Sequence, residues 1–150
     1  MRVVIQRVSH ASVSIDGKIK SEIRFGILLL LGVEDADEIN DVEWLCKKIS
    51  MLRIFNDANG LMNLSIAEAG GDVLVISQFT LFASTKKGNR PSFVRAARPE
   101  KAIHLYEQFI STLEAELQKK IFTGEFGALM KVELINEGPV TILMDSKNRD

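Results

Sequence analysis

One uninterrupted apolar segment, from Gly26 to Val33, constrains the fold more than any other part of the chain. A strand with apolar side chains on both faces must be covered on both, so we predict the central strand of a sheet here. After this segment the apolar residues recur at steps of three and four, through Ile39, Val42, Leu45, Ile49 and Leu52. This spacing gives a helix one apolar face. The chain therefore combines a strand buried on both sides with an amphipathic helix.

Shorter patterns predict the other elements. Asp16-Gly17 predicts a turn, since glycine accepts a positive φ. The strand segments predicted around this turn are Arg2–Val8, Ser12–Ile15 and Ile19–Ile23. The rest of the chain predicts, in order, a loop at 56–60, a turn at 70–71, a strand at 72–82, a helix at 99–120, strands at 130–135 and 140–144, and a frayed polar tail at 145–150. Strands outnumber helices and short turns join most of them. We therefore predict one α+β domain over residues 1–150, a largely antiparallel β-sheet with a barrel-like core and two main amphipathic helices.

Composition excludes several classes of protein. With 19 Lys or Arg and 20 Asp or Glu, the formal net charge is -1, which does not indicate a polyanion binder. Cys46 is the only cysteine, so no intrachain disulfide can form, as is typical of the reducing cytoplasm. The longest run free of glycine and polar residues, Ile27–Leu31, is far shorter than the roughly 18 residues of a membrane span. The N-terminal apolar residues end too early for a secretory signal. We expect a cytoplasmic protein without a membrane segment.

Side chains that commonly carry catalysis are scarce. His104 lies beside polar positions of the predicted second helix and should be solvated, whereas His10 ends the first predicted strand and should belong to a turn. Two scattered histidines and one cysteine provide neither a Cys–His pair nor a metal-binding set, so we expect no metal and no cofactor. Nucleophile-elbow, Walker and dinucleotide-binding glycine motifs do not occur. An enzyme with this inventory works without the usual activated side-chain nucleophile.

Polar residues interrupt the apolar strand that begins at Asp72. Ser77, Gln78 and Thr80 follow four apolar residues, and buried polar groups must be hydrogen-bonded or exposed at a cavity. Strand alternation would place Gln78 and Thr80 on one face, with Ser77 and Phe79 on the other. The segment is therefore either the wall of a cavity or a strand end that reaches solvent.

The pair Gly138-Pro139 separates two strand patterns. Proline cannot donate to a β-ladder, so an ordinary turn is the simpler interpretation. A cis peptide bond, which is uncommon, would instead present two successive carbonyl oxygens that could hold an ammonium group.

Positive charge is concentrated in one stretch. No acidic residue lies between Asp72 and Glu100, whereas five basic ones do: Lys86, Lys87, Arg90, Arg95 and Arg98. This stretch carries +5 and the remainder carries -6, because 14 positive residues there face 20 negative ones. Phe93 lies among the charges. The block is either a solvated loop or a surface for phosphate or single-stranded nucleic acid.

Together these features resemble the D-aminoacyl-tRNA deacylase family over essentially the whole chain. The segments that carry the resemblance occur in the family's order: Met1–Val8, Ser77–Leu81, Arg90–Phe93 and Asn136–Thr141. The resemblance implies a cytoplasmic homodimer and a chiral proofreading hydrolase. It would cleave the ester that joins a D-amino acid, or glycine on the wrong tRNA, to the terminal ribose. The implied partners are the 3′ end of aminoacyl-tRNA and a second copy of the chain, with no membrane.

The same resemblance assigns residues to the substrate. Gly138-Pro139 would be a Gly-cisPro motif that enters the partner's pocket, holds the α-amino group by its carbonyls and leaves no room for an L side chain. Arg7 would hold this motif in place. Met130 would face the adenosine or the motif. Ser77 and Gln78 would line the pocket, and Lys86, Lys87 and Arg90 would contact tRNA.

The resemblance also implies that Phe79 and Thr80 are the catalytic residues, through backbone N–H groups that would stabilise an oxyanion. The Thr80 hydroxyl is an alternative nucleophile, but no base lies near it in the sequence. The inventory therefore favours the terminal 2′-hydroxyl of the tRNA, with Thr80 structural or orienting. Glu137 and Leu129 depart from the family's usual acidic residues, and Leu129 loses a charge. Two other functions stay open: a non-catalytic RNA-binding module that uses the basic block at 86–98, and an amino-ester hydrolase independent of RNA.

Overall fold

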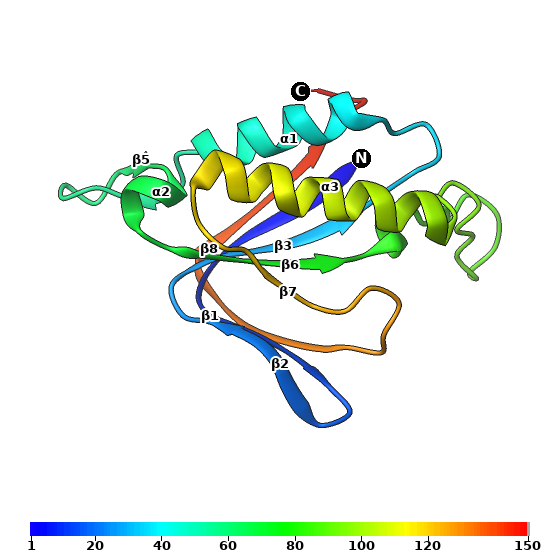
Figure 1. The fold of residues 1–150 in the computed structure, drawn as a ribbon, viewed down its shortest axis with the longest axis horizontal. Helices are drawn as coiled ribbons and strands as arrows, with labels where there is room; N and C mark the ends of the chain where they lie inside the picture. Colours follow the sequence, from blue (N-terminus) through cyan, green and yellow to red (C-terminus); the bar gives the residue numbers. More distant parts are fainter. Residues whose placement is uncertain (150) are drawn as a thin grey trace.

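The computed structural model describes residues 1–149 as a curved six-stranded sheet with two long helices on one face (Figure 1). In chain order the elements are β1 (Arg2–Ile15), β2 (Lys18–Ile23), β3 (Gly26–Gly32), α1 (Ile39–Met51), β4 (Phe55–Asn56), β5 (Met62–Leu64), α2 (Ile66–Ala69), β6 (Asp72–Ser77), the 3₁₀ helix η1 (Phe79–Phe82), α3 (Pro99–Leu117), β7 (Phe122–Thr123) and β8 (Lys131–Asp145). β4 and β5 form a separate hairpin.

β1 connects most of the sheet, since it pairs antiparallel with β2, β3 and β8. β6 pairs parallel with both β3 and β7, because α1 and α3 lie in the long connections that lead back across the sheet. The Ser21 hydroxyl of β2 donates to the Thr123 carbonyl of β7 at 2.6 Å, which nearly closes the sheet into a barrel. The predicted α+β class with its barrel-like core is confirmed, and the parallel pairs are an addition to it.

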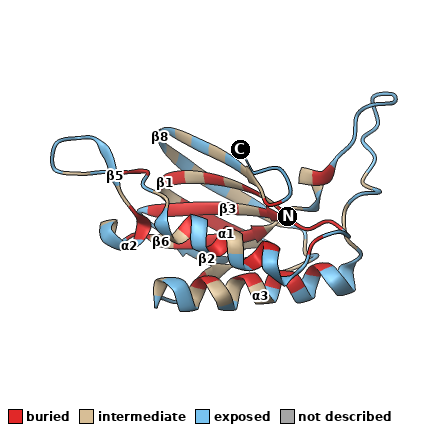
Figure 2. Cartoon of the chain, turned by 90° about the horizontal axis from the view of Figure 1, so that it is seen from above, coloured by how far each residue is buried: buried red, intermediate tan, exposed pale blue. Residues whose placement is uncertain are grey.

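β3 is buried on both faces, as its sequence predicts (Figure 2). Ile27, Leu29 and Leu31 point into the core between the sheet and the helices. Leu28 points the other way, into a second core inside the curved sheet, where it joins Leu74 of β6. Each such side chain contributes about 1.5–3 kcal/mol when fully buried. The two cores therefore meet at this strand and fix its position.

Long-range pairing extends two strands beyond their local patterns. β1 is continuous, although two strands are predicted there, and β8 continues through Gly138 and Pro139. His10 lies within β1, where its Nε2 is 2.8 Å from Glu22 Oε1 of β2, so the predicted turn is wrong. Each of the two strands supplies the other with a hydrogen-bonding partner along most of its length. Their pairing therefore overrides the local break signals.

Helix boundaries and loops also differ in detail. α3 ends at Leu117, and Gln118 takes a left-handed conformation with φ 49°, before the predicted end at Lys120. The β4–β5 hairpin and the short α2 occupy the region where only a loop and a turn are predicted. Ser65 begins α2 with a reciprocal cap, in which Ser65 and Glu68 each bond the other's backbone N–H. These short elements lack an apolar periodicity of useful length.

The C-terminal tail is docked over its described part. Ser146 is buried and its hydroxyl accepts a hydrogen bond of 2.8 Å from the Met1 ammonium, while Lys147 Nζ lies 2.7 Å from Asp41. Burial by itself raises the pKa of Asp41, but hydrogen bonds, chiefly from Lys147, hold that pKa below its ordinary value. The frayed-tail prediction is therefore wrong for these residues, and Asp150 lies outside the described residues.

Candidate functional site

The end of β6 shapes the candidate site. The ladder between β3 and β6 ends with Leu31 opposite Ser77, and the Gln78 N–H donates to the Leu31 carbonyl at 2.7 Å. The chain then turns into η1, which packs closely against the end of β3. Glycine at position 32 permits this approach, because a Cβ there would lie only 3.0 Å from the Gln78 carbonyl oxygen. The predicted continuous strand to Phe82 is wrong because β6 has no partner beyond this point. The alternation expected along that strand fails with it.

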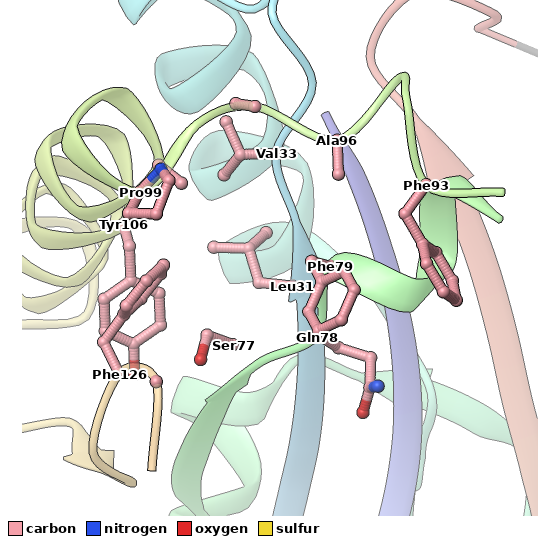
Figure 3. A pocket seen from close by; sticks show the side chains of 13 residues that line it. Leu31, Val33, Ser77, Gln78, Phe79, Phe93, Ala96, Pro99, Tyr106 and Phe126 are labelled. Carbon is pink, nitrogen blue, oxygen red and sulfur yellow. The ribbon is translucent and has the colours of Figure 1, made fainter.

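Beyond the strand end, a cavity of about 390 Å³ opens between β3, η1 and α3 (Figure 3). The residues that line it are Leu31, Val33, Ser77, Gln78, Phe79, Phe93, Ala96, Ala97, Pro99, Ala102, Tyr106, Phe126 and Gly127. Tyr106 and Phe126 lie on one side in an edge-to-face pair at 5.9 Å, and Phe79 and Phe93 form a second pair at 5.1 Å. The volume is in the range of small-ligand pockets.

The cavity wall contains no general base for neutral pH. Tyr106 is the only lining residue with an ionisable side chain. Its hydroxyl donates to the Val75 carbonyl at 3.0 Å, and burial raises its pKa to about 12. The Tyr106 hydroxyl therefore stays protonated and engaged, so any base must come from the substrate or from solvent.

Backbone donors are available where side-chain chemistry is lacking. Phe79 and Thr80 open η1, and the first N–H groups of a helix have no intrahelical acceptor. Neither of these two N–H groups donates to an acceptor within residues 1–149. Phe79 also lines the cavity and is 57% exposed, so its backbone lies at the rim. Such a pair of donors can stabilise an oxyanion.

Thr80 lies next to the cavity and is not among the residues that line it. Its hydroxyl accepts a short hydrogen bond from the Gln78 side-chain amide. This amide cannot remove a proton, so it orients the hydroxyl without activating it. Ser77, Gln78 and Phe79 are thus brought together at the cavity, whereas Thr80 is not part of its lining.

The basic block forms an exposed loop beside the cavity. Ser84 and Ser92 exchange backbone hydrogen bonds of 2.7 and 2.9 Å and close the loop as an isolated bridge. Lys86, Lys87 and Arg90 lie exposed between these two residues, and we call this group the basic tip. The two other cations of the block lie outside the tip. Arg95 pairs with Glu34 at 2.9 Å, and Arg98 occupies the N-cap position of α3 without a capping hydrogen bond from its side chain.

Gly138 and Pro139 lie elsewhere on the chain, in a protruding part of β8. Gln6 pairs with Thr141 and Val8 pairs with Asn136, so residues 137–140 lie opposite Arg7 alone. We call residues 137–140 the projection. The Gly138–Pro139 peptide is cis, both residues are exposed, and neither lines the cavity of its own chain.

Arg7 anchors the projection to the body of the protein. It is 8% exposed, and its Nε donates to the Glu137 carbonyl at 2.9 Å. Its Nη1 donates to the Ile54 carbonyl at 2.6 Å and to Asn56 Oδ1 at 3.2 Å. The guanidinium fork therefore joins the projection to the start of the β4–β5 hairpin.

Other singled-out residues lie outside the cavity. Met130 packs against the second core, inside the curved sheet. Leu129 is 91% exposed and His104 is exposed, as predicted for the latter. Burial raises the pKa of the Cys46 thiol to about 12, so this thiol is inert at neutral pH.

Sequence reasoning missed most of the cavity wall. Ala96, Ala97, Tyr106 and Phe126 line the cavity, but nothing in the sequence distinguishes them from ordinary core residues. Sequence reasoning also missed Asn136, although an asparagine two residues before a glycine-proline pair is a recognisable signal of a turn held by side-chain hydrogen bonds.

The described part of the chain contains neither a metal-binding cluster nor a membrane-spanning helix. Residues 1–149 contain no group of three or more His, Cys, Asp or Glu side chains placed to hold a metal ion. Within the same residues, no helix is both long enough and apolar enough to cross a membrane.

Similarity to known proteins extends over nearly the whole chain. Residues 4–145 match the family described as D-Tyr-tRNA(Tyr) deacylase. Proteins named D-aminoacyl-tRNA deacylase from Bacteroides fragilis and Flavobacterium johnsoniae are 63% and 58% identical over 150 residues, 100% of both chains in each case.

Two solved structures share the fold. One, described as c-Myc DNA Unwinding Element Binding Protein, has a TM-score of 0.89 at 39% identity, over 97% of this chain and 98% of that chain. Another, described as a probable eukaryotic D-amino acid tRNA deacylase, has a TM-score of 0.82 over 95% and 97% of the two chains. The latter is 16% identical, so it shows the fold alone.

Proposed function

The chain belongs to the D-Tyr-tRNA(Tyr) deacylase family and is a proofreading hydrolase of D-aminoacyl-tRNA, and from this premise we propose how its residues act. The enzyme class predicted from the sequence is confirmed, and the named relatives favour it over a non-catalytic RNA-binding module. We propose that the cavity receives the aminoacylated 3′ end of tRNA, in the cytoplasm.

One observation carries the chemical proposal: two unpaired backbone N–H groups adjoin a cavity without a general base. The ester carbonyl oxygen of the substrate points to the N–H groups of Phe79 and Thr80, which stabilise the charge that develops on it. Water adds to the carbonyl carbon, the bond to the ribose 3′-oxygen breaks, and that oxygen takes up a proton. The neighbouring 2′-hydroxyl assists these proton transfers, since Tyr106 is held protonated. Ser77 and Gln78 position the substrate.

The projection supplies chiral selection to the cavity of a second copy of the chain. It is exposed and does not line its own cavity, which supports a role in trans. The Gly138 and Pro139 carbonyls accept hydrogen bonds from the α-amino group, and the nearby backbone excludes an L side chain. Glycine has no side chain to exclude, so glycine on the wrong tRNA is also a substrate. The enzyme is accordingly a homodimer.

The basic tip holds the tRNA backbone. Lys86, Lys87 and Arg90 are exposed together on a loop that continues into the cavity wall at Phe93. Phosphate contacts from this loop position the tRNA end without reading its sequence. Met130 lies outside the cavity of its own chain, and its contact with adenosine depends on how the 3′ end enters.

Mixed dimers test the arrangement in trans. In Ala102→Leu the longer side chain fills the cavity, and in Gly138→Ala the added Cβ would lie 3.0 Å from the Val140 nitrogen, so each homodimer should lose most of its deacylation of D-aminoacyl-tRNA. A heterodimer of the two variants, purified through two different tags, contains one intact cavity facing one intact projection. It should therefore recover about half of the wild-type deacylation of D-aminoacyl-tRNA.

An inactive heterodimer, or failure to isolate any dimer, would contradict the proposed arrangement in trans. His104→Leu, on the exposed face of the same helix, is the matched control for Ala102→Leu and should leave activity unchanged. Wild-type protein should spare L-aminoacyl-tRNA, and free D-amino acid esters should react no faster than their spontaneous rate. Rapid turnover of free esters would favour the hydrolase that is independent of RNA.

A further inference from the structure

Asn136 forms a hydrogen-bonded brace across the base of the projection. Its Oδ1 accepts from the Val140 N–H at 2.7 Å, and its Nδ2 donates to the Val140 carbonyl at 3.2 Å. The same Nδ2 also donates to the Thr141 hydroxyl oxygen at 3.0 Å. One side chain thus binds both backbone polar groups of the residue that ends the projection, and closes residues 136–140 into a ring.

The need for such a brace follows from the strand register. Residues 137–140 have only Arg7 opposite them on β1, so most of their backbone cannot join the ladder. Arg7 engages the first carbonyl of the projection, that of Glu137, and Asn136 engages the last, that of Val140. Neither Gly138 nor Pro139 has a ladder partner on β1, and no loop or turn hydrogen bond within residues 1–149 reaches their carbonyls. The two anchors therefore leave free the two carbonyls at the tip.

We propose that Asn136 is a positioning residue for chiral discrimination, because it fixes the direction of the Gly138 and Pro139 carbonyls. This inference rests on the proposed role of the projection in the partner's cavity. Arg7 restrains the projection from the body of its own subunit, and Asn136 restrains it from within. A binding group that must exclude an L side chain has to be held to within a fraction of an ångström, and only a braced backbone achieves this.

The chemistry of asparagine suits this brace. A carboxamide donates and accepts at the same time, which the paired N–H and C=O groups of Val140 require. Aspartate keeps the bond from the Val140 N–H but cannot donate to the Val140 carbonyl or to Thr141. It also places a second negative charge beside Glu137. Alanine loses all three bonds. The series Asn, Asp, Ala therefore weakens the brace in steps without changing the cavity.

The test measures the ratio of deacylation rates for D- and L-aminoacyl-tRNA, together with the thermal midpoint of unfolding. We expect Asn136→Ala to lower this ratio on the order of tenfold to a hundredfold, because displacement of a binding group by about 1 Å has effects of that size. Asn136→Asp should give an intermediate ratio. The exposed Asn148 provides the control, since Asn148→Ala should leave the ratio unchanged.

A structural role alone would lower stability and activity toward both substrates together, with an unchanged ratio, and that result would overturn the inference. If Asn136→Ala does not fold, Asn136→Asp decides by the same ratio. The variant Gly138→Ala, measured in the same assay, distinguishes the role of Asn136 from the role of the projection itself. If Gly138→Ala changes the ratio and neither Asn136 variant does, the positioning role is wrong while the proposed function stands. If Gly138→Ala leaves the ratio intact, the proposed role of the projection fails, and the role of Asn136 fails with it.

Discussion

The cavity and the projection lie on the same chain but are built in opposite ways. The cavity has mostly apolar walls that continue into the core between the sheet and the helices, as with Leu31 and Ala102. In the projection only Val140 packs against the core, and polar side chains, chiefly Arg7 and Asn136, hold the exposed remainder. A cavity formed by packing keeps its shape by excluding water, whereas an exposed loop keeps its shape only by hydrogen bonds.

This difference shows how catalysis and discrimination between D- and L-amino acids can be assigned to two separate parts of a protein. The cavity provides space and two N–H donors, which fit either hand of an amino acid equally well. The projection provides a rigid backbone with two free carbonyls, which does distinguish them when a second subunit inserts it. Mutations in the cavity should therefore change the rate for all substrates, and mutations in the projection should change the selectivity.

The largest effect that sharpens this comparison is expected from Arg7→Ala. Loss of the fork frees the projection and leaves the buried Ile54 carbonyl without its donor. Deacylation of D-aminoacyl-tRNA should fall on the order of a hundredfold in kcat/KM. The free energy of unfolding should fall by about 1–3 kcal/mol. Kinetics and urea denaturation measure the two effects, with the exposed Arg24→Ala as control. Wild-type kcat/KM in Arg7→Ala would show that the projection needs no anchor.

An effect on binding is expected from the basic tip. The triple variant Lys86→Ala, Lys87→Ala, Arg90→Ala should bind tRNA with a weaker dependence on salt. The magnitude of the slope of log affinity against log salt concentration should fall by about two to three, because each lost phosphate contact removes about 0.7–0.9 from it. The ratio for D and L substrates should not change, since phosphate contacts do not depend on the hand of the amino acid. Neutralising the exposed Lys18, Lys20 and Arg24 near β2 removes the same charge and serves as control. An unchanged slope in the tip variant would make the tip an ordinary solvated loop.

The smallest effect is expected from Thr80→Ala. Among residues 1–149 the Thr80 hydroxyl has only the Gln78 amide as its partner and no base, so its removal should lower kcat less than about tenfold. Removal of a true nucleophile costs on the order of a millionfold. Single-turnover kinetics with D-aminoacyl-tRNA distinguish the two values. Complete loss of turnover with intact folding and substrate binding would assign the chemistry to this hydroxyl and overturn the backbone mechanism.

The elements that could be predicted are those with a strong local pattern. Gly26–Val33 and the helix face that begins at Ile39 follow directly from the periodicity of apolar residues. The end of β6 could not be predicted, because Phe79, Leu81 and Phe82 are as apolar as a strand residue should be. Only the end of the ladder to β3 turns this segment into a 3₁₀ helix.

The candidate site divides in the same way. Its polar members, Ser77 and Gln78, are evident in the sequence because polar groups in an apolar strand need an explanation. Tyr106 and Phe126, which form part of its wall, are not evident in the sequence, since aromatic residues also fill ordinary hydrophobic cores. The sequence neighbours of Thr80 predict that no base lies near it, and within the described residues the cavity wall likewise contains no base for neutral pH.

Four properties of this protein can be predicted from its amino-acid sequence: the fold class, the central strand, the two long helices and the segments that resemble a tRNA deacylase. These properties depend on periodicity and on motifs, which are local. The exposed position of Gly138 and Pro139 outside the cavity of their own chain, and their anchoring by Arg7 and Asn136, depend on the folded chain. They arise from the register between β1 and β8, which leaves residues 137–140 opposite a single partner. Register is a relation between residues more than a hundred positions apart, and no local pattern contains it.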